Sequence, residues 1–372
     1  MVEAPRSIHD TNSAPGPLPA PVSEPRSSAA ADKLYVLTRA DLSPGYQAVQ
    51  AGHAIADWTA EHPQDAAGWR TTSNSLIVLT AADEQALYAL IAKAERRNIP
   101  LTCFREPDLG DEITAVALTP GDLTRKLCSN QPLVGRRCDD AAAVVAAKNA
   151  LARERRLRET SYAMMGCEQT PGQDVLAHGR SVREHYRVLR AHLLGQLDLH
   201  QAPNWRLPAW VDTYAEQLSA HAGDPWIVDR YLTMHDCGKP RVATLDDQGR
   251  RRFPGHAEAS ARAYLDTYLG EHTGPEGPAD AGRGRDQHEQ VADLIAHDMD
   301  IHLLKAAGVE RFCANPHAVI HLLAGLAEVT ANAAMFGGID STSFKIKYKQ
   351  LNSRGNAICA RLFDTNGQEA PQ

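Results

Sequence analysis

The sequence predicts two domains of different fold class, a small α/β domain with a mixed sheet and flanking helices, followed by an all-α helical bundle. Three observations predict this division. The chain has 372 residues, more than the roughly 100–200 residues of one ordinary domain. Short apolar runs alternate with helix-like segments as far as residue 135, and from residue 173 the apolar spacing is helical almost to the end. Hydrophobic residues at 43% and charged residues at 23% are typical of globular proteins, which excludes a fibre or a wholly disordered chain.

The N-terminal part divides into a tail and a folded domain. Residues 1–31 are rich in proline, serine and alanine and are expected to be disordered, because they cannot bury enough apolar surface to offset the entropy of ordering. Residues 32–135 are expected to form the α/β domain. Its strands are predicted at the apolar runs 34–37, 76–79, 100–104 and 114–118, and its helices at 48–58 and 82–97.

The rest of the chain is predicted to be helical. Residues 139–160 contain neither proline nor glycine and are rich in alanine, arginine and glutamate, which predicts a helical connector over residues 136–172. The bundle is expected over residues 173–358, interrupted by a surface loop at 273–286 where glycine, proline and aspartate gather. Residues 359–372 are expected to be a short tail.

The cysteine pattern, net charge and hydropathy limit the class of protein. The seven cysteines include no Cys-X-X-Cys pair, which argues against a zinc knuckle and favours a reducing cytoplasm. A formal net charge of −7 is unusual for a protein that coats nucleic acid non-specifically, although it is compatible with a local basic strip. No apolar run approaches the roughly 20 residues needed to cross a bilayer, so we expect no membrane partner.

Histidines are the most informative residues, because the chain contains 16 of them. His185 and His235 are each expected on the apolar stripe of a helix, and Asp236 follows His235 directly. Lys239 comes just after this pair. Three more inward-facing candidates follow in later segments: His256, His297 and Glu328. Any one inward histidine is more often a hydrogen-bonded core residue, but imidazoles and carboxylates that converge from several helices can hold a divalent ion.

The order of these motifs resembles the HD-domain metal-dependent phosphohydrolases, particularly the HD modules of CCA-adding tRNA nucleotidyltransferases and of RNA-repair enzymes. The motifs are His185, then His235-Asp236 within His-Asp-Cys-Gly-Lys-Pro, then Gly-His256-Ala-Glu-Ala-Ser, then His297, and the resemblance spans residues 173–358. The family usually ends its ligand set with aspartate, whereas this chain offers Glu328, with Asp340 as the alternative.

The resemblance implies a centre of one or two divalent ions that hydrolyses a phosphoester. His185, His235, Asp236 and Glu328 would hold the first ion, and His256 and His297 would hold a second ion or bind the phosphate. The choice among Mn, Fe, Ni, Co, Zn and Mg stays open. Lys239 would neutralise charge that develops on the phosphate; alternatively, it interacts with the end of a helix dipole.

A basic segment near the C-terminus is predicted to be a strand, because apolar residues alternate with lysines. Lys345 and Lys347 would then share one face, near Arg354 and after the hydroxyl of Ser341. This pattern predicts a track for phosphate or RNA, or an edge strand protected from pairing by its lysines.

The N-terminal domain resembles the archaeal/eukaryotic-type peptidyl-tRNA hydrolases over about 100 residues. The resemblance lies in the run from Leu34 to Gly45, in Gln50-Ala-Gly-His53-Ala, and in the later strands. It implies that Arg39, Gln50 and His53 contact RNA; hydrogen bonds that stabilise the fold are the alternative. The family's Gly-Lys-Gly-Lys run is replaced by Pro-Gly-Tyr-Gln, and its Asp-Ala-Gly-Arg-Thr-Gln segment by residues 106–112, so the family's catalytic lysine is absent.

Together these features predict a cytoplasmic phosphohydrolase of the HD superfamily that removes a phosphate from an RNA end, such as a 2′,3′-cyclic phosphate or a 2′-phosphate on tRNA. Three alternatives stay open. They are a nucleotide or dinucleotide phosphohydrolase, an RNA-binding or sensing protein with an inactive HD site, and a peptidyl-tRNA hydrolase.

Overall fold

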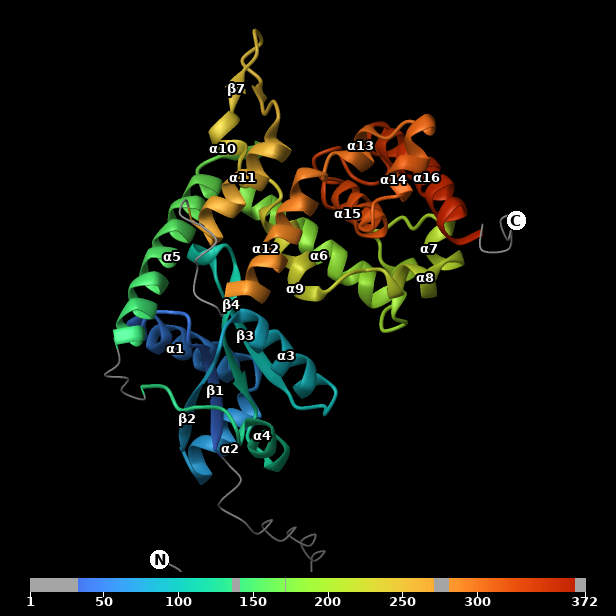
Figure 1. Ribbon diagram of the computed structural model, residues 1–372. Coiled ribbons are helices and arrows are strands. Elements are labelled where there is room, and N and C mark those ends of the chain that lie inside the picture. Colours follow the sequence, from blue (N-terminus) through green and yellow to red (C-terminus); the bar gives the residue numbers. More distant parts are fainter. Residues whose placement is uncertain (1–32, 136–140, 171, 271–280, 365–372) are drawn as a thin grey trace, which may run out of the picture.

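A computed structural model describes residues 33–135, 141–170, 172–270 and 281–364 (Figure 1). The tail predicted at 1–31, part of the loop predicted at 273–286 and residues 365–372 lie outside the described residues. The N-terminal part is a mixed sheet with flanking helices, and the C-terminal part is helical, as the sequence predicts. None of the described helices is long and apolar enough to span a membrane.

The sheet of the N-terminal domain has four strands in the order β2-β1-β4-β3. The strands are β1 (Leu34–Arg39), β2 (Leu76–Ala81), β3 (Leu101–Glu106) and β4 (Glu112–Leu118). Strand β1 pairs parallel to β2 and antiparallel to β4, which makes the sheet mixed. All four strands overlap the predicted apolar runs.

Helices cover both faces of this sheet because the side chains of β1 alternate between two apolar clusters. Leu34 and Val36 pack with α1 (Pro44–Glu61) and α2 (Pro63–Thr72). Tyr35 and Leu37 pack on the other face with α3 (Glu84–Glu95) and α4 (Asp122–Cys128). Helix α2 was not predicted, since only Ala66 is buried in it and its apolar period is weak.

A long helix, α5 (Ala141–Met165), lies within the predicted connector and leads to the helical domain (Figure 1). Helix α6 (Val175–Leu193) packs against α9 (Pro225–Met234) and α15 (Ala318–Ala331). The other helices are α7 (Ala209–Thr213), α8 (Ala215–Ala220), α10 (Lys239–Val242), α11 (His256–Tyr268), α12 (Ala281–Ala296), α13 (Asp300–Leu303), α14 (Val309–Cys313) and α16 (Thr342–Phe363). Short 3₁₀ turns and two small hairpins, β5-β6 (Glu168–Thr170 and Gln173–Asp174) and β7-β8 (Thr244–Leu245 and Arg251–Arg252), complete this domain.

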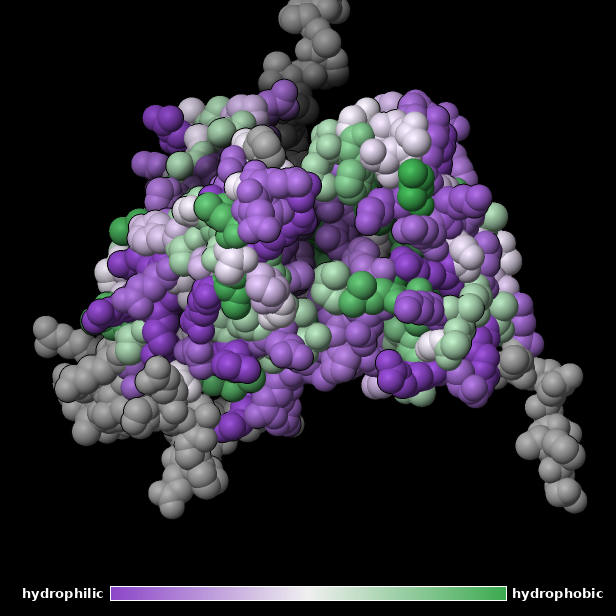
Figure 2. All heavy atoms as spheres, turned by 90° about the horizontal axis from the view of Figure 1, so that it is seen from above, coloured by the Kyte–Doolittle hydropathy of each residue, from purple (hydrophilic) through white to green (hydrophobic). Residues whose placement is uncertain are grey.

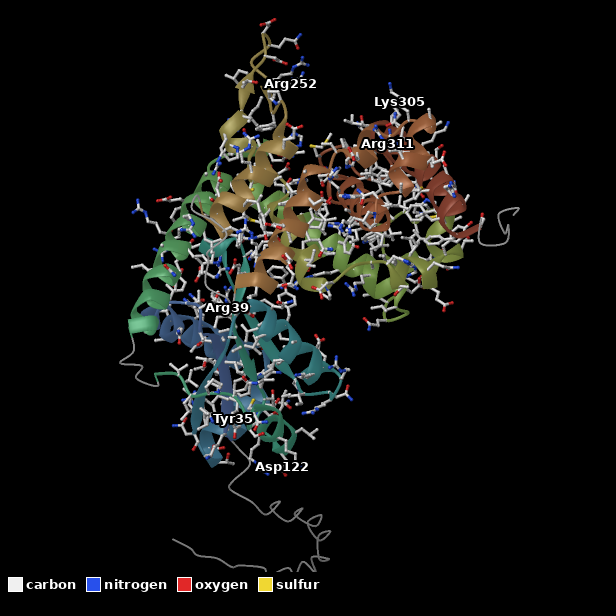
Figure 3. All side chains as sticks on the ribbon, in the orientation of Figure 1. Tyr35, Arg39, Asp122, Arg252, Lys305 and Arg311 are labelled. Carbon is white, nitrogen blue, oxygen red and sulfur yellow. The ribbon has the colours of Figure 1, made fainter. Side chains whose placement is uncertain are left out.

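Buried charges join the two domains. Glu84 at the start of α3 and Glu112 at the start of β4 both accept from Arg230 of α9. Arg39, at the end of β1, pairs with Glu112 from the other side and lies where the sheet meets the helical domain (Figure 3). Leu42 and Leu109 of the N-terminal domain also belong to the apolar core of the helical domain. The junction is therefore packed and paired, and it fixes the sheet against α9.

Three secondary-structure predictions are wrong. The segment predicted as a basic strand is the first part of α16, because Ser341 caps that helix and Phe344, Leu351 and Ile358 recur every seven residues on its buried face. That helix also continues to residue 363, into the predicted tail. The predicted loop at 273–286 is too long, since α12 already begins at residue 281.

Candidate metal centre

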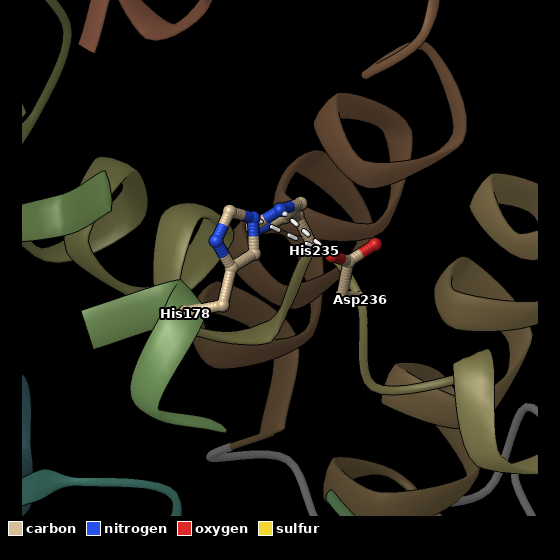
Figure 4. Close-up of side chains that lie close together, drawn as sticks. All are labelled: His178, His235 and Asp236. Carbon is tan, nitrogen blue, oxygen red and sulfur yellow. Dashed lines mark ion pairs between the residues drawn. The ribbon is translucent and has the colours of Figure 1, made fainter. Parts of the chain in front are cut away.

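Three buried side chains of the helical domain bring their ligand atoms together. His178 comes from α6, and His235 and Asp236 come from the end of α9. One ligand atom from each of the three lies within 4.8 Å of the others. Figure 4 shows the three side chains gathered at this point. All three residues are at most 2% exposed.

Glycines let the helices that carry these ligands approach closely. Gly179 follows His178 in α6, and a Cβ atom there would lie 2.3 Å from the carbonyl oxygen of Thr233 in α9. A Cβ atom on Gly238 would lie 2.3 Å from the backbone nitrogen of Ser260 in α11. Only glycine fits such contacts, so these two residues set the spacing of α6, α9 and α11 around the site.

Several polar atoms of the cluster have no hydrogen-bond partner among the described residues. They are both ring nitrogens of His178 and the Oδ1 atom of Asp236. The Nε2 atom of His178 is 3.7 Å from Asp236 and 3.9 Å from Glu328, both too long for hydrogen bonds. Buried polar atoms are nearly always paired, so each exception needs an explanation. A cation here would satisfy one ring nitrogen of His178 and the carboxylate oxygen of Asp236.

A second layer of residues borders the three ligands. His256, at the start of α11, places Nε2 at 3.7 Å from Oδ1 of Asp236. Glu328 of α15 pairs with Nε2 of His302 at 2.7 Å. Asp298, which follows α12, accepts a hydrogen bond of 2.6 Å from the hydroxyl of Tyr231. Nitrogen and carboxylate donors thus converge from six segments of the domain.

The electrostatic environment separates the two central histidines. Burial, followed by the charge of His235, lowers the pKa of His178 to about 4. Burial also opposes the charged form of His235, but the carboxylates of Asp236 and Asp298 raise its pKa to about 10. Burial disfavours ionisation of Asp236, yet His235 and Lys239 hold its pKa well below the usual range. His178 is therefore neutral, the form of imidazole that binds a metal, whereas His235 would release a proton when it binds one.

Lys239 lies directly behind Asp236. Its ammonium group donates hydrogen bonds to Oδ2 of Asp236 at 2.6 Å and to Gln169 at 2.9 Å, and it lies over the ring of Phe253. The side chain is buried. Lys239 is thus in place to hold the carboxylate and to supply positive charge at the site.

The residues present fit a divalent cation. With bonds of about 2.0–2.2 Å, donors around one ion stand roughly 3–4 Å apart. Oδ2 of Asp236 lies 3.7 Å from Nε2 of His178 and 3.2 Å from Nε2 of His235. Two imidazoles with carboxylates suit borderline divalent ions such as Zn, Fe, Mn, Co and Ni.

Two of the predicted ligands, His185 and His297, lie elsewhere. His185 is on α6, seven residues and thus about 10 Å along the helix from His178. It lies against Trp205 and bonds to the carbonyl oxygen of Ser181. The His297 side chain is 44% exposed and turns back to Asp293. The alternative ligand Asp340 is 83% exposed and pairs with Arg206.

The residues that sequence reasoning missed are His178, Asp298 and His302. The buried face of α6 runs through Val175, His178, Val182, Tyr186 and Leu189, so His178 is central to it and His185 is one position off. Extending the apolar stripe one turn toward the start of the helix would have found His178. Asp298 directly follows the chosen His297, and only the exact end of α12 distinguishes the two residues.

The predicted C-terminal phosphate track is also wrong. On a helix Lys345 and Lys347 point about 200° apart, so they share no face. The hydroxyl of Ser341 caps α16 by accepting from the amide of Phe344. Arg354 donates to the carbonyl oxygen of Leu304, which ties α16 to the segment after α13.

The predicted RNA contacts of the N-terminal domain are mostly structural. Arg39 is buried and bonded to Asp41 and Glu112. Gln50 is buried, donates to Glu106 and accepts from Thr114, each at 2.6 Å. His53 differs, since its side chain is exposed and stacks on the ring of Phe104. Arg39 and Gln50 are therefore fold-stabilising, which was the alternative prediction.

Helix α5 covers the part of the N-terminal domain that departs from the family pattern. Glu154 of α5 accepts from the backbone amide of Ser43 at 2.6 Å, at the start of α1. Arg158 lies over the ring of Tyr46, and Tyr162 donates to Asp108. The start of α1 and residues 106–112 are thus in contact with the connector.

Comparison with known proteins identifies the N-terminal domain. The family "Peptidyl-tRNA hydrolase PTH2" matches residues 33–125. A peptidyl-tRNA hydrolase from Thermococcus sibiricus (strain DSM 12597 / MM 739) is 32% identical over 114 residues, which is 27% of this chain and 97% of that protein. The matched residues contain the mixed sheet and α1 to α3, together with Arg39, Gln50 and His53. Through this domain, the chain belongs to the PTH2 family of peptidyl-tRNA hydrolases.

Proposed function

We propose that the helical domain is a metal-dependent phosphohydrolase of the HD type that acts on a phosphorylated RNA end. The observation that carries this proposal is the set of unpartnered buried donor atoms on His178 and Asp236. A buried cluster of this kind costs stability unless an ion or a ligand satisfies it. Its residue types are those that divalent ions prefer.

His178, His235, Asp236 and Glu328 would hold the ion, with His256, Asp298 and His302 around them. When bound, a divalent ion supplies an activated water near neutral pH and polarises a phosphoryl oxygen. Lys239 holds the carboxylate of Asp236 in one orientation and adds positive charge. His256, partly exposed beside Asp236, can donate a hydrogen bond to a phosphate oxygen.

An RNA substrate is favoured by a basic hairpin beside these residues. The β7-β8 hairpin projects from the domain between α10 and α11 (Figures 1 and 3). Its exposed side chains include Arg250, Arg251 and Arg252, of which Arg250 and Arg252 also pair with Asp246. Lys239 begins α10, and His256 begins α11 directly after the hairpin. The face seen in Figure 2 is hollowed near its centre and largely hydrophilic around the hollow. Arginines at this position suit the phosphates that flank an RNA end.

The test is phosphate release from an RNA that carries a 2′,3′-cyclic phosphate or a 2′-phosphate, with each divalent metal added in turn to metal-stripped protein. We expect metal-dependent release by the wild type. Asp236→Ala should lose the bound metal and the activity. Both should fall by more than about 100-fold, because loss of a residue that only supports a metal ligand already costs about 10–100-fold. The matched control is Asp266→Ala, an exposed acid that pairs with Arg241 on the neighbouring helix.

Two other outcomes would redirect the proposal. Release of phosphate from free nucleotides but not from RNA would make the protein a nucleotide phosphohydrolase. Metal uptake without turnover of any phosphoester would favour a sensing role for the helical domain.

Peptidyl-tRNA hydrolysis is the second candidate function, favoured by the family match over residues 33–125. Since α5 contacts the start of α1, this activity would require a substrate that binds beside α5 or displaces it. Cleavage of peptidyl-tRNA by wild type and Asp236→Ala distinguishes the two sites. Equal cleavage by both proteins would assign that activity to the N-terminal domain, and its absence would leave this domain a binding role.

A further inference from the structure

A second group of histidines and a carboxylate lies at the far end of α6. His192 is in the last turn of α6, His200 is in the short 3₁₀ turn at Leu199–Gln201, and Asp212 is in α7. One ligand atom from each lies within 4.8 Å of the others. Since His192 follows His178 by 14 residues, the two groups are about 21 Å apart along the helix.

The spacing of the donor atoms matches a tetrahedral ion. Nε2 of His192 and Nε2 of His200 each lie 3.2 Å from the same oxygen, Oδ1 of Asp212. Donors bound to zinc at about 2.0–2.1 Å are about 3.3 Å apart at the corners of a tetrahedron. Both imidazoles turn the same nitrogen, Nε2, toward the carboxylate.

The remaining nitrogen of His192 has a backbone partner of the kind that most metal-bound histidines have. Nδ1 of His192 lies 3.1 Å from the carbonyl oxygen of Leu197. The backbone amide of Leu199 also lies 3.3 Å from Nδ1, so the ring has a partner in either tautomer. With the proton on Nδ1, the ring donates to Leu197 and leaves the lone pair on Nε2, directed at the cluster; this is the tautomer that a metal ion selects. Asp198 caps the turn that presents His200 by accepting from its amide. The loop is therefore built to hold both rings.

Exposure gives the group a route for an ion and a fourth ligand. The side chains of His200 and Asp212 are 52% and 47% exposed, whereas His192 is 12% exposed. An ion here would be held from one side by protein and reached by water from the other. Three protein donors and one water form a complete zinc coordination sphere.

We propose that His192, His200 and Asp212 bind a zinc ion that clips the end of α6 to α7. The clip acts on a segment with little regular structure, residues 194–208, where only a short 3₁₀ turn connects the two helices. Helix α7 in turn packs against α16, where Trp210 fills the space beside Gly355. The ion thus holds α6 to α7, and through α7 it also supports the position of α16.

The test is zinc titration of the full-length, metal-stripped protein by calorimetry, with Co²⁺ as the spectroscopic probe of coordination. We expect Asp212→Asn and His200→Ala to lose one zinc equivalent. Their zinc affinity at this group should fall by at least about 100-fold, more than the loss of a residue that only supports a ligand would cost. Asp236→Asn should keep this equivalent. His221→Ala, an exposed histidine bonded to the carbonyl oxygen of Gln217, is the matched control and should bind as the wild type does.

Folding does not confound this test, because the substituted side chains are exposed and circular dichroism checks each variant. His200→Cys keeps a zinc donor and should restore tight binding that His200→Ala loses. Zinc should also raise the thermal midpoint of Asp236→Asn, but not that of the Asp212→Asn/Asp236→Asn double variant, in which both groups have lost a ligand. If His200→Ala and Asp212→Asn both bind zinc with the stoichiometry and affinity of the His221→Ala control, the group makes only histidine–aspartate hydrogen bonds and the proposal is wrong.

Discussion

Two buried polar clusters of this protein differ in how their charged groups are paired. The charged groups of the junction all have ion-pair partners, although Nε of Arg230 has no hydrogen bond among the described residues. At the domain junction, Arg39 bonds to Asp41 and Glu112 with all of its terminal nitrogens, and Glu112 also faces Arg153 and Arg230. In the helical domain, both nitrogens of His178 and Oδ1 of Asp236 have no such partner among the described residues.

The difference separates a structural role from a functional one. Paired charges satisfy one another, and removal of one partner leaves the other as an uncompensated charge in the core. Unpartnered donors cost stability in the folded chain and are retained where they bind something. The same reasoning explains why Arg39 and Gln50, which the family resemblance suggests as RNA contacts, are occupied by the fold.

The largest effect is expected at the paired cluster. Glu112→Gln leaves three arginines without their shared carboxylate and should lower the free energy of unfolding by about 3–5 kcal/mol, measured in urea. Glu159→Gln, in an exposed pair with Arg155, is the control and should change it by less than about 0.5 kcal/mol. Metal uptake by the folded Glu112→Gln protein should stay at the wild-type level. A parallel loss of metal would show that the two clusters are not separate.

Lys239 tests the boundary between the two roles, because it is both paired and adjacent to the proposed ligands. Lys239→Met keeps most of the side-chain volume but removes the charge beside Asp236. We expect RNA phosphate release to fall by about 100-fold while the metal content is retained. Lys93→Met, on the exposed face of α3, is the control. An unchanged rate of phosphate release would show that Lys239 interacts only with the end of a helix dipole.

The unpartnered cluster should respond in the opposite direction to the paired one. His178→Leu replaces two unsatisfied buried nitrogens with an apolar group, so the metal-free protein should gain about 1–2 kcal/mol in free energy of unfolding. The same variant should lose metal binding. His185→Leu, two turns along the same helix, removes a bonded imidazole and should give no such gain. Destabilisation by His178→Leu in metal-free protein would contradict the comparison.

The sequence predicted the sheet well because its strands are short apolar runs bounded by turns, and each one overlaps an observed strand. The sequence also predicted that His235, Asp236, His256 and Glu328 lie in one site, and the structure brings these four together. This succeeded because the apolar period and the helix ends nearby fix the direction of these side chains. It failed for His185 because periodicity over one helix cannot decide between two histidines seven residues apart. Which one meets α9 depends on Gly179, whose close contact with Thr233 is a tertiary feature.

The failure at residues 341–349 has a different physical cause. Alternating lysines predict a strand when only nine residues are considered. The helical period of Phe344, Leu351 and Ile358 extends over a longer segment and buries more apolar surface. Tertiary burial overrides a short local pattern, so segments of this length need the wider context.

The smallest effect, and the finest test of the paired cluster, concerns acid stability at the junction. Burial and then Arg153 lower the pKa of His288 to about 3; its ring is hydrogen-bonded to the hydroxyl of Tyr264. Unfolded histidine binds a proton below about pH 6.5, whereas folded His288 does not. Stability should therefore fall as the pH drops from about 6.5 toward 5, since the unfolded state takes up the proton. His288→Asn should reduce this loss by about 1 kcal/mol in urea titrations at pH 7 and pH 5.5. The buried His178 and His321 also have lowered pKa values and preserve part of the slope. A slope identical to the wild type's would show that His288 takes up its proton without opening the junction.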